Sequence, residues 1–157
     1  MKAKFLTMIM ILVVFAAVTQ SVSAETSTVP GTYLLNQKDG YKQLLTLTPG
    51  KQAFSQNSGQ FDPTGPFGDQ QGSWAMINGM IWVRTLDFTT DPNNNNALNG
   101  FGRSLFKIRQ NANGTLAGDV TVEIFPLDAD PLNLKPTNVP LRVFGPISFT
   151  GKRLAIK

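Results

Sequence analysis

Neither cysteine nor histidine occurs anywhere in the 157-residue chain. Without cysteine there can be no disulfides, no thiolate ligands for zinc and no thiol nucleophile. Without histidine, the commonest general base and the commonest transition-metal ligand are also missing. The sequence therefore excludes Ser-His-Asp and Cys-His catalysis, and any enzyme chemistry would have to use Asp, Glu, Lys, Tyr or Arg.

Charged residues are scarce as well, at 15% of the chain against roughly 25% in an average globular protein. The 11 Phe and 2 Trp residues supply apolar surface that offsets the entropy cost of ordering, which argues against disorder. Lys and Arg do not cluster apart from Lys152 and Arg153, so there is no nucleic-acid footprint. The length fits one domain.

The N-terminus has the pattern of a signal peptide. Lys2 and Lys4 precede an apolar run over residues 5–18, and Val22 and Ala24 occupy the positions before a signal-peptidase cut. The run of 14 residues is short of the roughly 20 that span a bilayer. We predict a signal helix within residues 1–24, cleavage after Ala24, export by the general secretory route, and a periplasmic or extracellular domain over 25–157 without a membrane span.

Short runs of β-branched, aromatic and aliphatic residues follow one another after residue 25, separated by turn residues. The strongest signal lies over residues 74–88, where Asn78 and Gly79 can both adopt the positive φ of a two-residue hairpin turn. Further turns are predicted at Asp39-Gly40, Pro49-Gly50 and Asn113-Gly114. No window has convincing helical periodicity.

This pattern predicts an all-β fold of seven to nine short strands linked mostly as neighbours. We favour an up-and-down antiparallel β-barrel of about eight strands over a sandwich, because closure removes two exposed sheet edges. A barrel of this size has an interior that side chains can fill or that can hold one small ligand.

Three long connections interrupt the pattern. The first, over residues 56–72, carries Phe61 and Phe67, and we predict that it folds over the barrel mouth with one of these rings near Trp74. The second, over 89–100, contains only short polar residues around its Asn run and is predicted to be mobile. The third, over 126–140, contains Pro131, Pro136 and Pro140 and is predicted to be extended.

Two short motifs resemble those of the calycins, the group that contains lipocalins and avidins. The motif Pro30-Gly31-Thr32-Tyr33 is similar to the Gly-x-Trp opening of calycins, with Tyr in place of Trp, and Gln71-Gly72-Ser73-Trp74 is similar to a Gly-x-Trp strand of lipocalin-like bacterial proteins. The resemblance implies an eight-stranded barrel with a ligand-capable interior. It also implies that a basic residue of the last strand, Arg153 or else Arg142, packs over the ring of the first strand.

Six residues form the candidate ligand-binding set. Trp74, Trp82 and Arg84 share one predicted hairpin and could stack a flat ligand and pair with its anionic group. Alternatively, both Trp residues fill the core and Arg84 points to water. Arg103 could converge on the same mouth or lie at a solvated strand end. The remaining members of the set are Phe61 and Phe67 of the first long connection.

Metal and acid–base chemistry have little support. Asp87, Asp91, Asp128 and Asp130 are too sparse and lack the loop spacing that calcium needs, so we expect no metal and no cofactor. Glu123 is the only glutamate within a predicted strand. Pointing inward, it would be a buried acid or base, and pointing outward, it would be an ordinary solvent-facing residue.

Three functions stay open. The first is an exported barrel that binds a small apolar or amphipathic ligand in its mouth, without enzymatic activity. The second is a barrel isomerase or cyclase, by fold-level analogy with the allene-oxide-cyclase and dirigent barrels. The third is a protein-interaction module with a filled core. The oligomeric state does not follow from the sequence.

Overall fold

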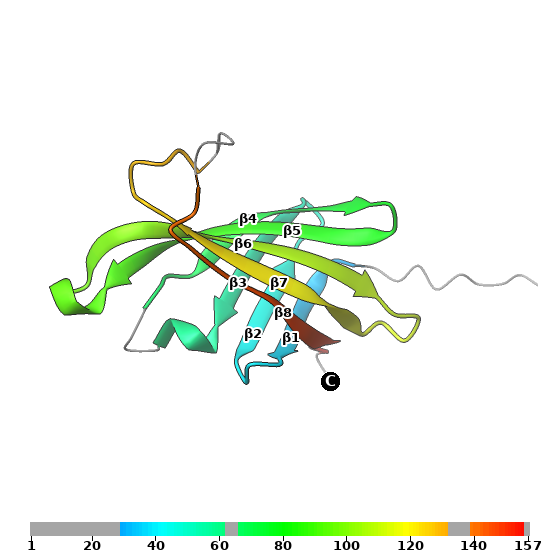
Figure 1. Ribbon diagram of the computed structural model, residues 1–157. Helices are drawn as coiled ribbons and strands as arrows, with labels where there is room; N and C mark the ends of the chain where they lie inside the picture. The colour runs from blue at the N-terminus through cyan, green and yellow to red at the C-terminus, as the bar shows by residue number, and fades with distance from the viewer. Residues whose placement is uncertain (1–28, 62–65, 132–138, 156–157) are drawn as a thin grey trace, which may run out of the picture.

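The computed structural model describes residues 29–61, 66–131 and 139–155 (Figure 1). The predicted signal peptide, residues 1–24, lies outside these ranges. The strands are β1 (Gly31–Gln37), β2 (Lys42–Leu47), β3 (Gln52–Asn57), β4 (Gln70–Ile77), β5 (Met80–Asp91), β6 (Ala97–Gln110), β7 (Leu116–Phe125) and β8 (Arg142–Arg153), with the short 3-10 helices η1 (Ser58–Phe61) after β3 and η2 (Pro92–Asn94) after β5. None of the helices in these ranges is long and apolar enough to cross a membrane.

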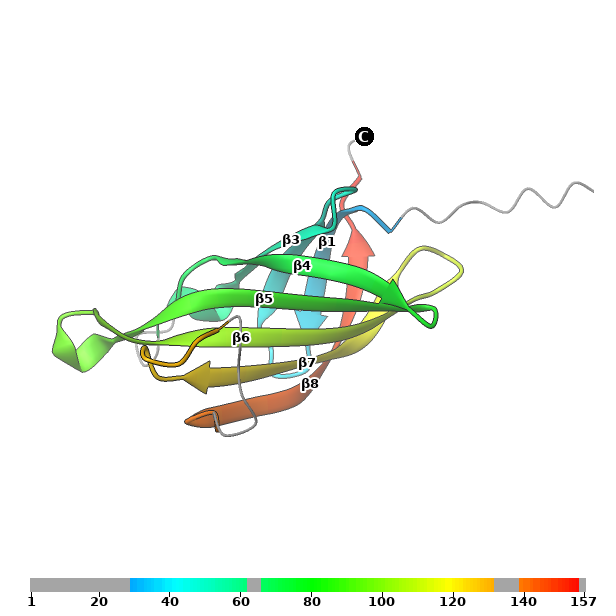
Figure 2. The same ribbon diagram turned by 90° about the horizontal axis from the view of Figure 1, so that it is seen from above.

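The eight strands form one closed barrel in which each strand pairs antiparallel with the next and β8 returns to β1 (Figures 1 and 2). The predicted fold class, an up-and-down antiparallel barrel of about eight strands, is confirmed. The Asn-Gly hairpin turn is also present, with φ of 50° at Asn78 and 74° at Gly79. Positive φ at both positions gives the turn the twist of its two strands.

A dry core fills the end of the barrel at which Trp74 lies. Tyr33, Leu35 and Ile108 are fully buried there, and Trp74 is 5% exposed. The indole Nε1 of Trp74 donates to the carbonyl of Thr48 at 2.9 Å, so the polar atom of the ring is satisfied. Side chains therefore close this end of the barrel.

An arginine side chain lies where the last strand, β8, pairs with the first, β1. In the register of β1 and β8, Arg153 lies opposite Tyr33, and its guanidinium donates to the carbonyl of Pro30 at 2.6 Å. The Tyr33 hydroxyl donates to the carbonyl of Val29 at 2.7 Å. Burial raises the pKa of Tyr33, and the nearby charge of Arg153 partly opposes this effect. Of the two basic residues considered for this place, Arg153 is the one that lies opposite Tyr33 in the register.

The other end of the barrel is open because the strands differ in length. β1 pairs only with the final part of β8, from Phe149 to Arg153, whereas β7 pairs with β8 back to Arg142. Among the described residues, 142–147 are therefore paired along one edge only. Figure 2 shows β5 to β8 extending beyond β1 to β3 at this end.

The predicted long connection over residues 89–100 is wrong in its extent. β5 continues to Asp91 and β6 already begins at Ala97, with only η2 and a short turn between them. Asn95 and Asn96 adopt φ of 51° and 55°, and the Asp91 carboxylate accepts from the backbone N–H of Asn93 at 2.9 Å. Asn tolerates this left-handed conformation, so the polar run forms a tight turn between two long strands.

Candidate functional site

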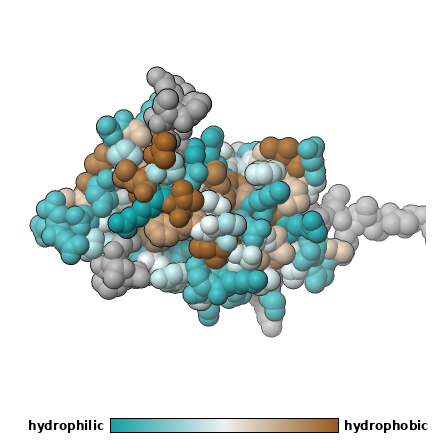
Figure 3. Space-filling view, viewed as in Figure 1, coloured by the Kyte–Doolittle hydropathy of each residue, from teal (hydrophilic) through white to brown (hydrophobic). Residues whose placement is uncertain are grey.

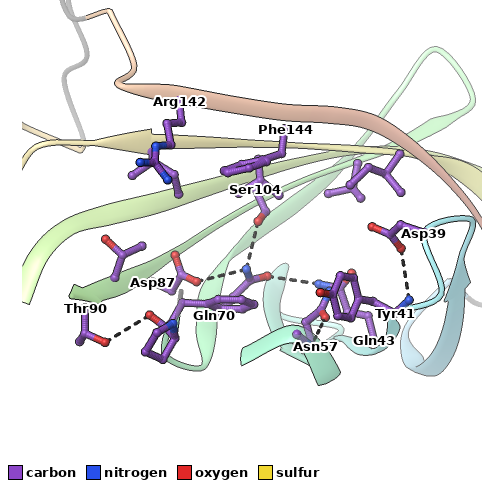
Figure 4. A pocket seen from close by; sticks show the side chains of 18 of the residues that line it. Asp39, Tyr41, Gln43, Asn57, Gln70, Asp87, Thr90, Ser104, Arg142 and Phe144 are labelled. Carbon is purple, nitrogen blue, oxygen red and sulfur yellow. Dashed lines mark hydrogen bonds between the residues drawn. The ribbon is translucent and has the colours of Figure 1, made fainter. Parts of the chain in front are cut away.

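A cavity of about 750 Å³ occupies the open end of the barrel; we call it the mouth cavity (Figure 4). It is bounded by residues of all eight strands and by the connection that precedes β4. Its lining is apolar on one side and polar on the other.

One side is apolar and comes from β7 and β8. Because alternate residues of a strand point to the same face, inward positions of these two strands project into the cavity together. We call these residues the apolar wall: Val120, Val122, Ile124, Phe144 and Ile147. Figure 3 shows hydrophobic residues gathered over the start of β8, and Phe144 is still 48% exposed. The wall is accessible from outside at Phe144, whereas Val120 at its inner end is buried.

The opposite side is a network of side-chain amides. We call the cavity-lining members the polar floor: Gln37, Gln43, Gln70, Asp87 and Ser104. Gln37 Nε2 donates to Gln43 Oε1 at 2.8 Å, and Gln43 Nε2 donates to Ser55 Oγ at 2.6 Å. The same Gln43 nitrogen reaches Gln70 Oε1 at 3.3 Å. These bonds hold the side-chain amides in one arrangement across the four consecutive strands β1 to β4.

Gln70 connects these amides to the acidic part of the floor. Its Nε2 donates to Ser104 Oγ at 3.1 Å and to Asp87 Oδ2 at 3.3 Å, and its Oε1 accepts from the Thr85 hydroxyl at 3.3 Å. Within the described ranges, no buried side-chain nitrogen or oxygen lacks a hydrogen-bond partner. The floor is a preorganised polar surface, since each of its groups is fixed by another.

Asp87 is the one charged residue of this floor and is only 8% exposed. Burial raises its pKa to about 6, and hydrogen bonds from Gln70 and the backbone of Gly102 partly oppose that rise. A side chain at position 102 would overlap Asp87 Oδ1, so glycine there makes room for the carboxyl group. Asp87 can therefore exchange a proton near neutral pH.

Aromatic and charged side chains form the rim of the mouth cavity. Tyr41 and Phe67 line it from the side of β2 and β4, and Asp39 and Asp91 add two further carboxyl groups. Arg142, at the start of β8, is the one basic residue among the described residues that line the cavity. Figure 4 shows Asp39 and Arg142 at opposite ends of the view, with the polar floor between them.

Of the six residues predicted to bind a ligand, Phe67 is the one that lines the mouth cavity. It is half-buried and forms a β-bridge with Thr89. Trp74 pairs with Val83. Val83 and Thr89 are six residues apart on β5, which is about 20 Å at about 3.3 Å per residue. The predicted packing of Phe67 near Trp74 is therefore wrong: the ring lies at the open end, and Trp74 lies in the filled core. The side chain of Phe61 lies outside the described residues.

Trp82, Arg84 and Arg103 lie on the outer face of the barrel. Trp82 is 42% exposed, with the Lys107 ammonium 5.4 Å from its ring centroid. Arg103 forms an ion pair of 2.6 Å with Glu123 and does not converge on the mouth. The outward alternative for Glu123 is the one observed, and its partner Arg103 lies beside it on the same face.

The residue pattern was not interpreted as a polar floor in the sequence analysis, although a signal for the floor exists. On β5, Asp87 follows Ile81, Val83 and Thr85 at intervals of two residues, so it continues their inward-facing row. On β1, Gln37 continues the row of Tyr33 and Leu35 in the same way. A polar residue at the end of an inward-facing apolar row indicates where the filled core of a barrel gives way to a polar cavity.

Metal ligands are not gathered at this site. Within the described ranges, no group of three or more Asp or Glu residues is arranged to hold a metal ion. The chemistry of the mouth cavity is therefore that of amides, hydroxyls, one buried carboxyl group and an apolar wall.

Comparison with known proteins finds no match to any family model, curated protein or solved structure. The class of this protein, a closed eight-stranded antiparallel barrel with one open mouth, comes from its fold alone.

Proposed function

We propose that this protein binds a small amphipathic molecule in the mouth cavity. The observation that carries the proposal is the two-sided lining: an apolar wall from β7 and β8 faces a polar floor from β1, β2, β4, β5 and β6. The volume of about 750 Å³ is within the range of roughly 300–1,000 Å³ that is typical of small-molecule sites. An interaction module with a filled core has less support, because one end of the barrel is hollow.

Burial against the apolar wall would supply the affinity, and the floor would supply the orientation. Apolar surface removed from water contributes roughly 25 cal/mol per Å². The amide floor is already fixed by its own hydrogen bonds, so little ordering cost is left for the moment of binding.

Titration with Nile red, a neutral apolar dye, tests this proposal with a matched pair of variants. Phe144 belongs to the apolar wall, whereas its neighbour Val143 is exposed and alternates to the other face of β8. We expect Phe144→Ala to weaken dye binding about tenfold, as loss of about 1.4 kcal/mol of ring contact would do, and Val143→Ala to leave it unchanged. Equal effects of the two substitutions would contradict the proposal.

Native mass spectrometry of the protein from its own host would identify a natural ligand. We expect a retained small molecule, released on unfolding, whose amount falls in Phe144→Ala.

A second candidate function, a barrel isomerase or cyclase, is favoured by one observation, the buried Asp87 carboxyl group with its pKa raised to about 6. Conversion of the retained molecule by wild-type protein, but not by Asp87→Asn, would support it.

We also propose that the chain is an exported, calycin-like barrel. The position of Arg153 opposite Tyr33 supports the calycin likeness, and the residue pattern up to Ala24 supports export. N-terminal sequencing of secreted or periplasmic protein should begin at Glu25. Retention of Met1 in a membrane fraction would contradict the export proposal.

A further inference from the structure

We propose that the molecule bound in the mouth cavity is an organic cation, in which an apolar body carries a protonated amine that pairs with the Asp87 carboxylate. The inference rests on the proposed function, because it names the class of ligand for the same cavity. Its basis is a buried carboxyl group that faces the cavity without a cation beside it.

Asp87 has hydrogen-bond donors but no countercharge. Gln70 and the backbone of Gly102 donate to it, and both are neutral groups. Among the described residues, no Lys or Arg nitrogen lies within salt-bridge distance of its oxygens. A buried carboxylate without an opposite charge is costly, and a cation that enters from the cavity removes that cost.

The placement of Asp87 suits an amine that arrives with an apolar body. The carboxyl group lines the cavity on the side of β5, and the Ser104 hydroxyl lines it from the adjacent strand β6. Figure 4 shows Asp87 and Ser104 on either side of the Gln70 amide, with Phe144 of the apolar wall above them. An ammonium group has three donors, enough for Asp87 and one further floor oxygen.

The other charges around the cavity favour the same sign of ligand. Asp39 lies in the turn between β1 and β2, Asp91 lies at the end of β5, and both line the cavity with Asp87. Arg142 on β8 is the opposing charge. It is exposed at the rim, as Asp39 is, and water screens both charges more than that of the buried Asp87. Tyr41 is the remaining titratable group at the rim. Three carboxyl groups thus oppose one guanidinium.

Protonation of Asp87 would remove the partner of the amine. Burial raises the pKa of Asp87 to about 6, so the carboxylate predominates above that pH and the neutral acid below it. The ammonium group of an alkyl amine stays charged across this range. Affinity for the cation should therefore fall as the pH drops through about 6, while affinity for a neutral analogue should not.

Three dansyl probes of similar length test the inference. Dansylcadaverine carries an ammonium group, its N-acetyl derivative is neutral, and dansyl-ε-aminocaproate carries a carboxylate. Fluorescence titration at neutral pH should give dissociation constants about tenfold lower for the cation than for the neutral probe, the difference that one buried charge-assisted hydrogen bond makes. The preference should disappear below pH 6.

Two variants locate the effect. Asp87→Asn should abolish the preference for the cation, so that the cation and the neutral probe bind with equal affinity. Circular dichroism and thermal unfolding show whether the variant is folded. Asp91→Asn, a matched change at the rim, should keep the preference. If Asp87→Asn does not fold, loss of the cation preference below pH 6 in wild-type and Asp91→Asn protein still tests the inference.

The possible outcomes separate this inference from the proposed function. Equal binding of all three probes, or a preference for the carboxylate, would overturn the cation inference and leave the amphipath proposal standing. A cation preference that survives Asp87→Asn would overturn the role of Asp87. Failure of every probe to bind, Nile red included, would overturn both.

Discussion

At the scale of single residues, Asp87 marks the point on β5 at which the inward-facing side chains change from uncharged to charged. It continues the inward row of Ile81, Val83 and Thr85 on β5, but its neighbours are Gln70 of the adjacent strand β4 and the space of the mouth cavity. The alternation of the strand predicts that Asp87 faces the same side as Ile81. It does not predict the cavity, because the residues that bound it come from all eight strands.

Replacement of Asp87 tests whether the pKa of its carboxyl group is raised in the folded protein without any ligand. The pKa rises from 3.8 to about 6 on folding, so the folded protein binds more protons than the unfolded chain between these values. Protonated Asp87 therefore stabilises the folded state by about 3 kcal/mol. This stabilisation is fully present below pH 3.8 and is lost as the pH rises through about 6.

We therefore expect the free energy of unfolding of wild-type protein, relative to Asp87→Asn, to fall by up to about 3 kcal/mol between acidic and neutral pH. Urea unfolding of both proteins across this range measures the difference directly. Parallel pH profiles of the two proteins would show that Asp87 titrates normally.

At the scale of elements, the hairpin of β4 and β5 shows what local sequence determines. Its turn was predictable because Asn78 and Gly79 supply the positive φ that a two-residue connection needs. The alternation of β5 was predictable too, with Trp82 and Arg84 on one face and Ile81 and Val83 on the other. Which face points inward was not, since both carry apolar residues and the choice depends on packing against distant strands.

Gly79→Ala isolates the backbone contribution of this turn. A Cβ at Gly79 would meet no atom within 4 Å, but φ there is 74°. We expect a loss of about 1 kcal/mol in thermal or urea unfolding. Gly50→Ala is the matched control, because its Cβ would make only an ordinary contact with Thr48. An equal loss in both variants would refute the backbone explanation.

The two halves of β8 should differ in local stability. Phe149 and Gly151 lie in the part of β8 that pairs with both β7 and β1, whereas Val143 and Phe144 lie where β7 is the one paired neighbour in the described ranges. We expect amide hydrogen exchange at Val143 and Phe144 to be at least tenfold faster than at Gly151. Uniform protection along β8 would mean that the mouth is closed in solution.

At the scale of the whole molecule, the closed barrel was predictable, but the end at which it stays open was not. Repeated short strands and tight turns indicate a meander, and the need to cover two edges indicates closure. The mouth exists because β1 covers only the final part of β8, a register between Tyr33 and Arg153 at opposite ends of the chain. No local pattern encodes that register. The candidate site was displaced for the same reason, from Trp74 in the filled core to the floor around Gln70.

Methyl NMR during titration with Nile red shows whether a ligand occupies the mouth cavity or the filled core. We expect shifts concentrated on the methyl groups of Val122, Ile124 and Ile147 in the apolar wall. The methyl groups of the filled core, those of Leu35, Leu45 and Ile108, should stay unchanged. Shifts centred on the core or on the outer face around Trp82, or no shifts at saturating dye, would contradict binding in the mouth cavity.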